Sequence, residues 1–523
     1  MDVALLVGAY ARSHASRHYS QQRILYEALR DAILRGELKA GIRLASSRSL
    51  ADTLRIARNS VLYAYERLAE EGLVEANRQG SRVSRVLLAG LSGSRQREAL
   101  DTRGEAPPHL PARRSGKQRV HLGAPPDNEC TPAEGFGKPR PPSIVDRRLS
   151  PGLPALDAFP VAAWRRAVNR AWQHGGEDLL SDADVDGHPA LRAAIADDLR
   201  IRRGLRCTDA QVFITDGTQN SVEACVQALL RPADTVWFEN PGYTGARRIF
   251  AAAGMRVEAI PVDGEGMAPG DTAWQRTPPR MVFVTPSHQY PLGSVLSLSR
   301  RAAFIAQARS HRSWIIEDDY DSEFRHDGDP LPALQGLADA APVIYLGTFS
   351  KTLFPAMRMA FMVVPQALCH TFSDGMRRMK RHARTVDQIA LADFIAGGAY
   401  ARHLRSMKRL YALRRHALIE AVTTHLGDGV TVGDTGGMHV TVRLNVPVRD
   451  IDVARAMAAI GVDVSSLSRS YSDLEMGSGA VHDHNGFVLG FANLPEGDAM
   501  QCVAALAAVI RGMASSSGRD GIR

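Results

Sequence analysis

Cysteines are few in this 523-residue sequence, and long apolar runs are lacking. The five cysteines are scattered and form no Cys-x-x-Cys pair, which argues against a disulfide framework or a zinc site and favours a reducing compartment. The N-terminal segment, residues 1–7, is apolar only briefly and contains an acid, so it makes a poor signal peptide. Because no stretch approaches the length of a membrane span, we expect a cytoplasmic protein.

Acidic residues are fewer than basic ones: the sequence contains 56 aspartates and glutamates and 64 lysines and arginines, which gives a net charge of +8. This excess allows a polyanionic partner but does not identify one. The length is too great for one ordinary core, and 45% hydrophobic with 23% charged residues indicate globular domains. We expect a DNA-binding domain at residues 18–86, a flexible linker at 87–145 and a large α/β domain at 146–513.

The first region has the pattern of a winged helix-turn-helix. Apolar residues at helical spacing predict a helix from Ile24 to Ile33, Ser46 or Ser47 can cap a second helix, and a third helix begins near Arg58. Two short strands then form the wing, and the third helix of such a domain enters the major groove. The candidate contacts with DNA bases or phosphates are Arg48, Arg58, Asn59, Arg78 and Arg82. The alternative for these side chains is an ordinary solvated face.

Residues 87–145 are rich in Gly, Pro, Ser and Arg and show no sustained periodicity, which is typical of a linker. As a flexible coil this segment would span roughly 45 Å, enough to let the first domain lie beside a neighbouring subunit. Its arginines either contact DNA or are solvated, and we favour solvation.

Two apolar runs in the large domain end in reactive side chains. The run from Trp314 leads into Asp318 and Tyr320, and the run from Tyr345 leads into Lys351. Such runs predict buried parallel strands whose carboxyl ends present these groups. A desolvated lysine can attack an aldehyde, an acid can hold a pyridine nitrogen protonated, and a phenol can bond the adjacent ring oxygen. Together they indicate a pyridoxal phosphate (PLP) site, and a buried lysine–aspartate pair in an ordinary α/β core is the alternative.

A glycine turn offers the matching phosphate site. It follows an apolar strand at residues 212–215 and opens a helix, where unpaired N–H groups and the helix dipole favour an anion. Residues close to the lysine carry hydroxyl and guanidinium groups that can share the same phosphate. The candidate phosphate contacts are Gly217, Thr218, Gln219, Thr348, Ser350 and Arg358.

Several long motifs resemble one protein family. The sequence W-I-I-E-D-D-Y-D-S-E-F at 314–324, G-T-F-S-K at 347–351 and the arginine that follows the lysine are similar to the aminotransferase-like domain of MocR/GabR regulators, a branch of the GntR family. The segments at 36–48 and 58–66 are similar to the GntR DNA-binding pattern. The resemblance implies a fold type I aminotransferase architecture, with a smaller α+β subdomain in the last part of the chain.

The resemblance also implies roles for single residues. PLP would be held as a Schiff base on Lys351, Tyr243 would stack on its ring, and His288 would lie at the edge of the cofactor. A tyrosine that packs a turn and a hydrogen-bonded loop histidine are the respective alternatives. A homodimer is implied as well.

The sequence departs from the family pattern in several places. Ala40 and Ala45 stand where proline is usual, and residues 182–187 lack the tyrosine that usually contacts the phosphate of the partner subunit. Residues 486–493 contain no arginine to clamp a substrate carboxylate, which argues against an ordinary α-amino acid as effector. The segment 482–484 has metal-ligand residue types, but its glycine-rich setting favours a solvated loop, and we expect no metal site.

We therefore expect a PLP-dependent transcriptional regulator that binds a double-stranded DNA operator as a homodimer. PLP itself, an amine or an amino acid would be the effector. We favour a regulator over an enzyme and leave residual transaminase chemistry open. Two alternatives remain: a working aminotransferase with an appended DNA-binding module, and a DNA-binding protein whose second domain is a scaffold without cofactor.

Overall fold

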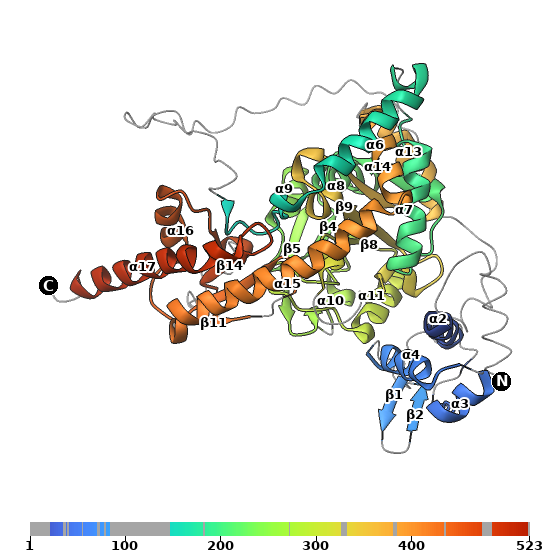
Figure 1. Cartoon of the computed structure of the whole chain (residues 1–523), viewed down its shortest axis with the longest axis horizontal. Coiled ribbons are helices and arrows are strands. Elements are labelled where there is room, and N and C mark those ends of the chain that lie inside the picture. Colours follow the sequence, from blue (N-terminus) through green and yellow to red (C-terminus); the bar gives the residue numbers. More distant parts are fainter. Residues whose placement is uncertain are drawn as a thin grey trace.

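The structure is a computed structural model of the whole chain (Figure 1). The predicted linker at 87–145 lies outside the described residues, as does Arg78. No helix in the described part of the chain is long and apolar enough to cross a membrane. The structure describes residues 21–34, 38, 41–54, 56–70, 74–77, 80–83, 147–180, 184–270, 272–325, 332–379, 384–433, 436–472 and 484–520.

The first described region contains three helices followed by a two-stranded antiparallel sheet. Ser46 precedes the second helix, and its hydroxyl accepts a hydrogen bond from the Ser49 backbone N–H at 3.2 Å, as an N-cap does. The helices bury their apolar faces around Leu29 and Val61. The predicted winged helix-turn-helix is thereby confirmed. Its elements are α2 (Gln21–Leu34), α3 (Ser47–Leu54), α4 (Arg58–Glu70), β1 (Val74–Asn77) and β2 (Gly80–Val83).

An eight-stranded sheet forms the centre of the large domain. Its strand order is β3-β10-β9-β8-β7-β4-β5-β6, with parallel pairing from β5 through β4, β7 and β8 to β9. The mainly parallel sheet was predicted, whereas β10, which is antiparallel to both of its neighbours, was not. The strands are β3 (Val212–Thr215), β4 (Thr235–Asn240), β5 (Arg256–Asp263), β6 (Gly266–Met267), β7 (Met281–Val284), β8 (Trp314–Asp319), β9 (Val343–Thr348) and β10 (Ala360–Val363).

Helices cover both faces of this sheet, and β8 shows why residues 314–316 are continuously apolar (Figure 1). Successive side chains of a strand point to opposite faces. Ile316 packs with Phe250 of α9 on one face, whereas Ile315 packs with Phe304 of α11 on the other. The helices of this domain are α6 (Val161–His174), α7 (Pro189–Arg202), α8 (Thr218–Leu229), α9 (Thr244–Ala252), α10 (Ala273–Arg276), α11 (Leu298–His311), α12 (Phe349–Thr352), α13 (Cys369–Met379) and α14 (Thr385–Ala396).

The last part of the chain forms the predicted smaller α+β subdomain. A four-stranded antiparallel sheet with the order β11-β12-β14-β13 packs beside three helices, and the long helices α15 and α17 lie against each other (Figure 1). The elements are α15 (Ala399–His425), β11 (Val430–Val432), β12 (His439–Leu444), α16 (Asp450–Ala459), β13 (Ser465–Ser466), β14 (Gly486–Gly490) and α17 (Glu496–Asp520).

The segment between Lys351 and Arg358 is not a continuous helix. Helix α12 makes a single turn, and Phe354 is extended (φ −155°, ψ 145°) because a proline follows it. A 3-10 turn, Pro355–Met357, then leads to Arg358, which has the left-handed φ of 48°. The backbone therefore reverses at Arg358 and continues directly into β10.

Candidate cofactor and DNA-binding sites

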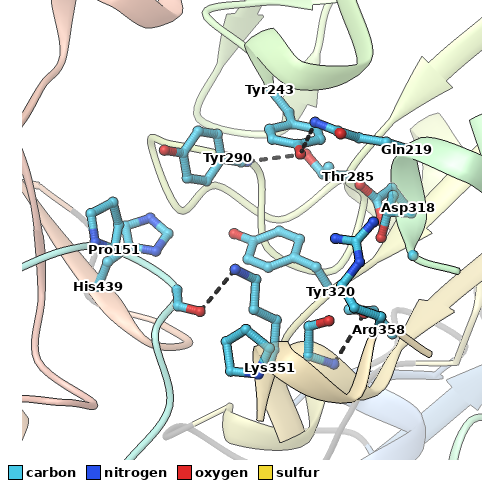
Figure 2. A pocket seen from close by; sticks show the side chains of 16 residues that line it. Pro151, Gln219, Tyr243, Thr285, Tyr290, Asp318, Tyr320, Lys351, Arg358 and His439 are labelled. Carbon is cyan, nitrogen blue, oxygen red and sulfur yellow. Dashed lines mark hydrogen bonds between the residues drawn. The ribbon is translucent and has the colours of Figure 1, made fainter. Parts of the chain in front are cut away.

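A cavity of about 340 Å³ lies at the carboxyl ends of β8 and β9 (Figure 2). Other parts of its wall come from the turn after β3, the loops after β4 and β7, strand β12 of the small subdomain and the segments 151–152 and 355–358. Of the residues predicted to bind the cofactor, all but His288 line this cavity: Gly217, Thr218, Gln219, Tyr243, Asp318, Tyr320, Thr348, Ser350, Lys351 and Arg358. The lining residues that sequence reasoning did not single out are Pro151, Gly152, Thr285, Tyr290, Pro355 and His439.

Lys351 enters the cavity from α12, directly after β9. Its Nζ donates a hydrogen bond to the Gly152 carbonyl oxygen at 2.8 Å. Gly152 has a φ of +72°, and a Cβ there would lie 2.5 Å from Lys351 Nζ, so a side chain would displace the amine. Burial lowers the pKa of Lys351, although Asp321 and Asp318 oppose that shift. A lowered pKa increases the unprotonated fraction of the amine, which is the form that attacks an aldehyde.

Asp318 also lines the cavity, near the end of β8. Burial, with added repulsion from Asp319 and Glu239, raises the pKa of Asp318 to about 8. Its Oδ1 atom is buried and has no hydrogen-bond partner among the described residues. Because a buried acceptor without a donor is costly, the site fits a ligand that brings an N–H group, as a protonated pyridine nitrogen does.

The third part of the cavity is a cluster of hydrogen-bond donors. Gly217 precedes α8 with a φ of +128°, so the first N–H groups of that helix are available to an anion. A Cβ at Gly217 would lie 3.7 Å from the Arg358 guanidinium, which places this arginine against the same turn. Thr348 and Ser350, which carry hydroxyl groups, also line the cavity. These donors match the chemistry of a phosphate group.

Two tyrosines form an aromatic wall of the cavity (Figure 2). The Tyr243 hydroxyl accepts a hydrogen bond from Gln219 Nε2 at 3.3 Å, and its ring meets Tyr290 edge-on at a centroid distance of 6.2 Å. Burial raises the pKa of Tyr290 to about 12, so its hydroxyl stays protonated near neutral pH. An aromatic wall of this kind can pack against a pyridine ring.

His288 lies behind the cavity wall rather than in it. The residue is 6% exposed, and its Nδ1 lies 3.0 Å from the Tyr320 hydroxyl and 3.0 Å from Asp321 Oδ2. His288 therefore does not line the cavity as predicted, but it contacts Tyr320, which does. The sequence signal for this arrangement is the acid that directly follows the tyrosine.

His439 reaches the cavity from β12 of the small subdomain. Its Nε2 lies 3.2 Å from the Pro291 carbonyl oxygen, which can only accept, so Nε2 carries the proton. Burial, followed by the nearby His288, lowers the pKa of His439 to about 4, and the ring is therefore neutral at pH 7. The sequence offered only a weak signal, the glycine pair at 436–437 just before the strand.

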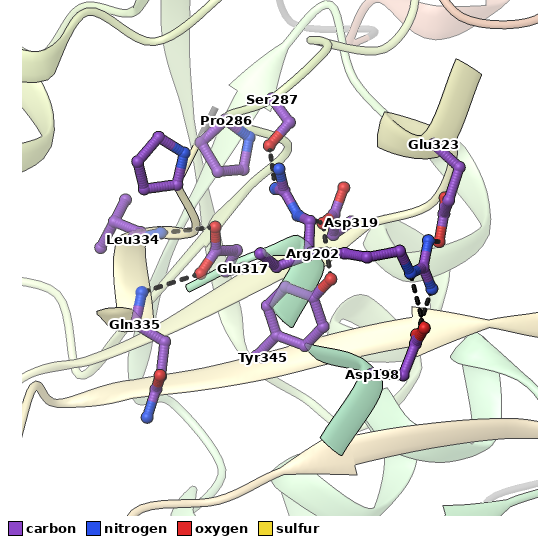
Figure 3. Close-up of polar contacts among 12 residues, drawn as sticks. Asp198, Arg202, Pro286, Ser287, Glu317, Asp319, Glu323, Leu334, Gln335 and Tyr345 are labelled. Atoms are coloured by element: carbon purple, nitrogen blue, oxygen red, sulfur yellow. Dashed lines mark hydrogen bonds and ion pairs between the residues drawn. The ribbon is translucent and has the colours of Figure 1, made fainter. Parts of the chain in front are cut away.

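A buried charge network supports β8 from the side away from the cavity (Figure 3). Asp318 lines the cavity, whereas its neighbours Glu317 and Asp319 point to the opposite face. Arg203 Nε lies 2.7 Å from Asp319 Oδ2, and these side chains are 2% and 1% exposed. The Glu317 carboxylate accepts the backbone N–H groups of residues 334 and 335 at 2.8 and 3.0 Å. These pairs hold the strand that carries Asp318.

The predicted DNA-binding residues lie on the first domain. Arg48 on α3 and Arg58 at the start of α4 are exposed, and Arg58 Nε donates to Ser47 Oγ at 3.3 Å. Arg82 lies half-buried on β2. The side chains of Asn59 and Arg78 are not among those that the structure describes.

Residues 21–83 match the family of bacterial regulatory proteins of the gntR type, and residues 148–468 match aminotransferase class I and II. The chain is also 37% identical to the probable rhizopine catabolism regulatory protein MocR of Rhizobium meliloti, over 89% of this chain and 90% of that protein. This chain belongs to the MocR-type branch of the GntR family. As a MocR-type regulator it combines a DNA-binding domain with an aminotransferase domain.

Further relatives agree with this membership. The pyridoxine biosynthesis regulator PdxR of Corynebacterium glutamicum is 30% identical to this MocR-type chain, over 90% of this chain and 92% of that protein. The α-aminoadipate aminotransferase LysN of Thermus thermophilus, solved with N-(5'-phosphopyridoxyl)-L-leucine, is 26% identical with a TM-score of 0.63 and covers 70% of this chain and 92% of its own. The fold type I architecture is thereby confirmed, and PLP is the cofactor expected of it.

Proposed function

We propose that this MocR-type regulator binds PLP in the cavity and that its affinity for an operator changes with the occupant of that cavity. PLP itself or an amine that reacts with it would be the signal. The name of the Corynebacterium relative, a pyridoxine biosynthesis regulator, favours PLP as the signal. The predicted homodimer is part of the same proposal, because two DNA-binding domains would then bind two half-sites.

Each group in the cavity has a task in this proposal. PLP, when bound, supplies an electrophilic aldehyde that captures amines. Lys351 Nζ would hold that aldehyde, and Asp318 would accept a hydrogen bond from the pyridine nitrogen. The N-terminus of α8 and Arg358 would hold the phosphate, and Tyr320 would bond the ring oxygen.

One observation carries the proposal above the others. The buried Asp318 Oδ1, without a partner among the described residues, shares a single cavity with Lys351 and with the donor cluster at Gly217 and Arg358. An acceptor, an amine and an anion site are the three features by which a protein can bind PLP. An ordinary buried lysine–aspartate pair does not require an anion site.

The proposal is tested first with Lys351→Ala. Purified wild-type protein mixed with PLP should show a visible absorbance band that borohydride traps on the protein, whereas Lys351→Ala should show neither. Lys351→Arg is the matched control, because it keeps the positive charge but lacks the amine. Circular dichroism of all three proteins checks that the fold is retained.

Operator binding is then measured on the same proteins, with and without PLP, on DNA upstream of the coding region. A change in the affinity or footprint of the wild-type protein that both variants lack is the expected result. If Lys351→Ala forms the trapped band as the wild type does, the assignment of Lys351 is wrong. If wild-type protein binds PLP while its DNA binding stays the same, PLP is not the signal, and an amine effector should be screened.

A further inference from the structure

Tyr320, His288 and Asp321 form a hydrogen-bonded chain that begins at the cavity wall. Tyr320 lines the cavity beside Lys351 (Figure 2). Its hydroxyl lies 3.0 Å from His288 Nδ1, and the two Asp321 carboxylate oxygens lie 3.2 and 3.0 Å from the same nitrogen. Asp321 is 1% exposed and His288 is 6% exposed, so water does not compete for these contacts.

The carboxylate decides which way these hydrogen bonds run. An ionised carboxylate can only accept, so the proton of His288 must reside on Nδ1. A protonated Nδ1 cannot accept, and the Tyr320 oxygen is therefore an acceptor in its contact with His288. The Tyr320 O–H proton is then left to be donated on the other side of the phenol, which is the cavity.

The small subdomain holds this pair of residues in position. Gly437, just before β12, has a φ of +58°, and a Cβ there would overlap Asp321 Oδ2 and lie 2.5 Å from His288 Nδ1. A Cβ at Gly436 would lie 2.9 Å from the same imidazole. The glycine pair thus allows the backbone of the small subdomain to close tightly over the histidine and the aspartate.

We propose that Asp321 and His288 are positioning residues that keep the Tyr320 hydroxyl oriented as a hydrogen-bond donor to the ring oxygen of the bound cofactor. This inference rests on the proposed function, because it requires PLP in the cavity. Hydrogen-bond donation to the ring oxygen favours the cofactor form that has lost its proton, and so lowers the pH at which the visible band of the bound cofactor changes.

Other charged and titratable groups also face Tyr320, so the test must separate hydrogen bonding from charge. Burial raises the pKa of Tyr320 well above its ordinary value, and nearby acids add to that effect, so the phenol is protonated at neutral pH. The groups around Tyr320 and its partner His288 are Asp318, Asp321, Glu239, Tyr290, Lys351 and His439.

The test is a double-mutant cycle read from the pH midpoint of the visible band in the PLP-loaded full-length protein. Asp321→Asn removes the charge and the requirement for a proton on Nδ1, so that His288 can adopt the tautomer protonated at Nε2, in which the lone pair of Nδ1 accepts from the Tyr320 hydroxyl. In wild-type protein Asp321→Asn has two effects. The Tyr320 hydroxyl no longer donates to the ring oxygen, which raises the pH midpoint, and a negative charge is lost. In a Tyr320→Phe protein the same substitution removes only the charge, which lowers the midpoint.

We expect the shift caused by Asp321→Asn to be more positive by about 1 pH unit when Tyr320 is present than when it is replaced by phenylalanine. Equal shifts in the two backgrounds would overturn the inference. Ser322→Ala is the matched control: Ser322 Oγ is buried next to Asp321 and has no hydrogen-bond partner among the described residues, so its loss should leave the midpoint unchanged. A wild-type protein without any visible band would instead overturn the proposed function itself.

A second measurement does not depend on Asp321→Asn folding. Nitrogen NMR of wild-type protein with ¹⁵N-labelled histidine, with His288 assigned by comparison with His288→Gln, reports which ring nitrogen is protonated. A proton on Nδ1 is the expected result. A neutral ring protonated at Nε2 alone would contradict the inference, whatever the visible spectrum shows.

Discussion

At the scale of single residues, Asp318 couples stability to pH in the cofactor-free protein. Its pKa is raised from 3.8 to about 8, so the folded state holds a proton that the unfolded state has released between these values. The stability contributed by Asp318 is therefore fully present below about pH 4 and is lost as the pH rises toward about 8. A salt-bridged carboxylate shows the opposite pH dependence, because the stability it contributes is lost as the pH falls.

Asp318→Asn should flatten this pH dependence. The amide stays neutral, so the free energy of unfolding of the cofactor-free variant should fall less steeply with pH, by up to about 1.4 kcal/mol per pH unit. Urea unfolding at several pH values between about 5 and 8 measures the slope. Burial raises the pKa of Glu239 to about 7 as well, and this acid repels Asp318, so both proteins are compared in a Glu239→Gln background. Parallel slopes would show that Asp318 does not titrate in this range.

Arg58→Ala tests the DNA-binding domain at the same scale. Arg58 is exposed at the start of α4, the helix that enters the major groove in this kind of domain. If the side chain reads a base, the variant should bind the operator about 1–3 kcal/mol more weakly and lose specificity. Random-sequence DNA is the control in the same titration. An equal loss of affinity for both DNAs would assign Arg58 to a phosphate contact.

At the scale of elements, Arg203 joins the end of α7 to three segments of the sheet region. It pairs with Asp319 of β8, whose Oδ2 also accepts from the Tyr345 hydroxyl of β9 at 2.6 Å, and it donates to Ser287 Oγ after β7 at 2.7 Å. Ser287 immediately precedes His288. The arginine therefore fixes the mutual position of the strand ends that carry the cavity residues.

Arg203→Met should destabilise the protein by about 3–5 kcal/mol, because Asp319 would remain buried without its ion-pair partner. The double variant Arg203→Met/Asp319→Leu should recover most of this loss, since it removes both charges. Urea unfolding of the wild type and the three variants completes the cycle. Additive losses from the two single changes would mean that the pair is not coupled.

At the scale of the whole molecule, matches to two protein families lie in one chain. The match to GntR regulators ends at residue 83 and the match to aminotransferases begins at residue 148. Residues 84–146, between the two matches, lie outside the described residues. The predicted fold class and family are confirmed, whereas the predicted boundaries at 18–86, 87–145 and 146–513 stay predictions.

Much of the fold followed from local patterns in the sequence. Continuous apolar runs such as 314–316 predicted strands buried on both faces, and the structure places them next to each other as β7, β8 and β9. Strand β10 was missed because its four residues follow β9 after a reversal at Arg358, and no period in the sequence signals that reversal. Short strands whose pairing depends on a distant turn are poorly marked in sequence.

The sequence by itself determined the chemical groups of the site: an amine at Lys351, an acid at Asp318 and a glycine turn at Gly217 that opens a helix are set by residue identity and by local strand ends. Only the tertiary structure decided which groups contact and position these residues. The Gly152 carbonyl oxygen accepts a hydrogen bond from Lys351. Tyr320 is oriented by His288 and Asp321, and His439 of the small subdomain completes the cavity wall. These contacts join segments separated by tens to hundreds of residues, and no local periodicity determines how such segments pack.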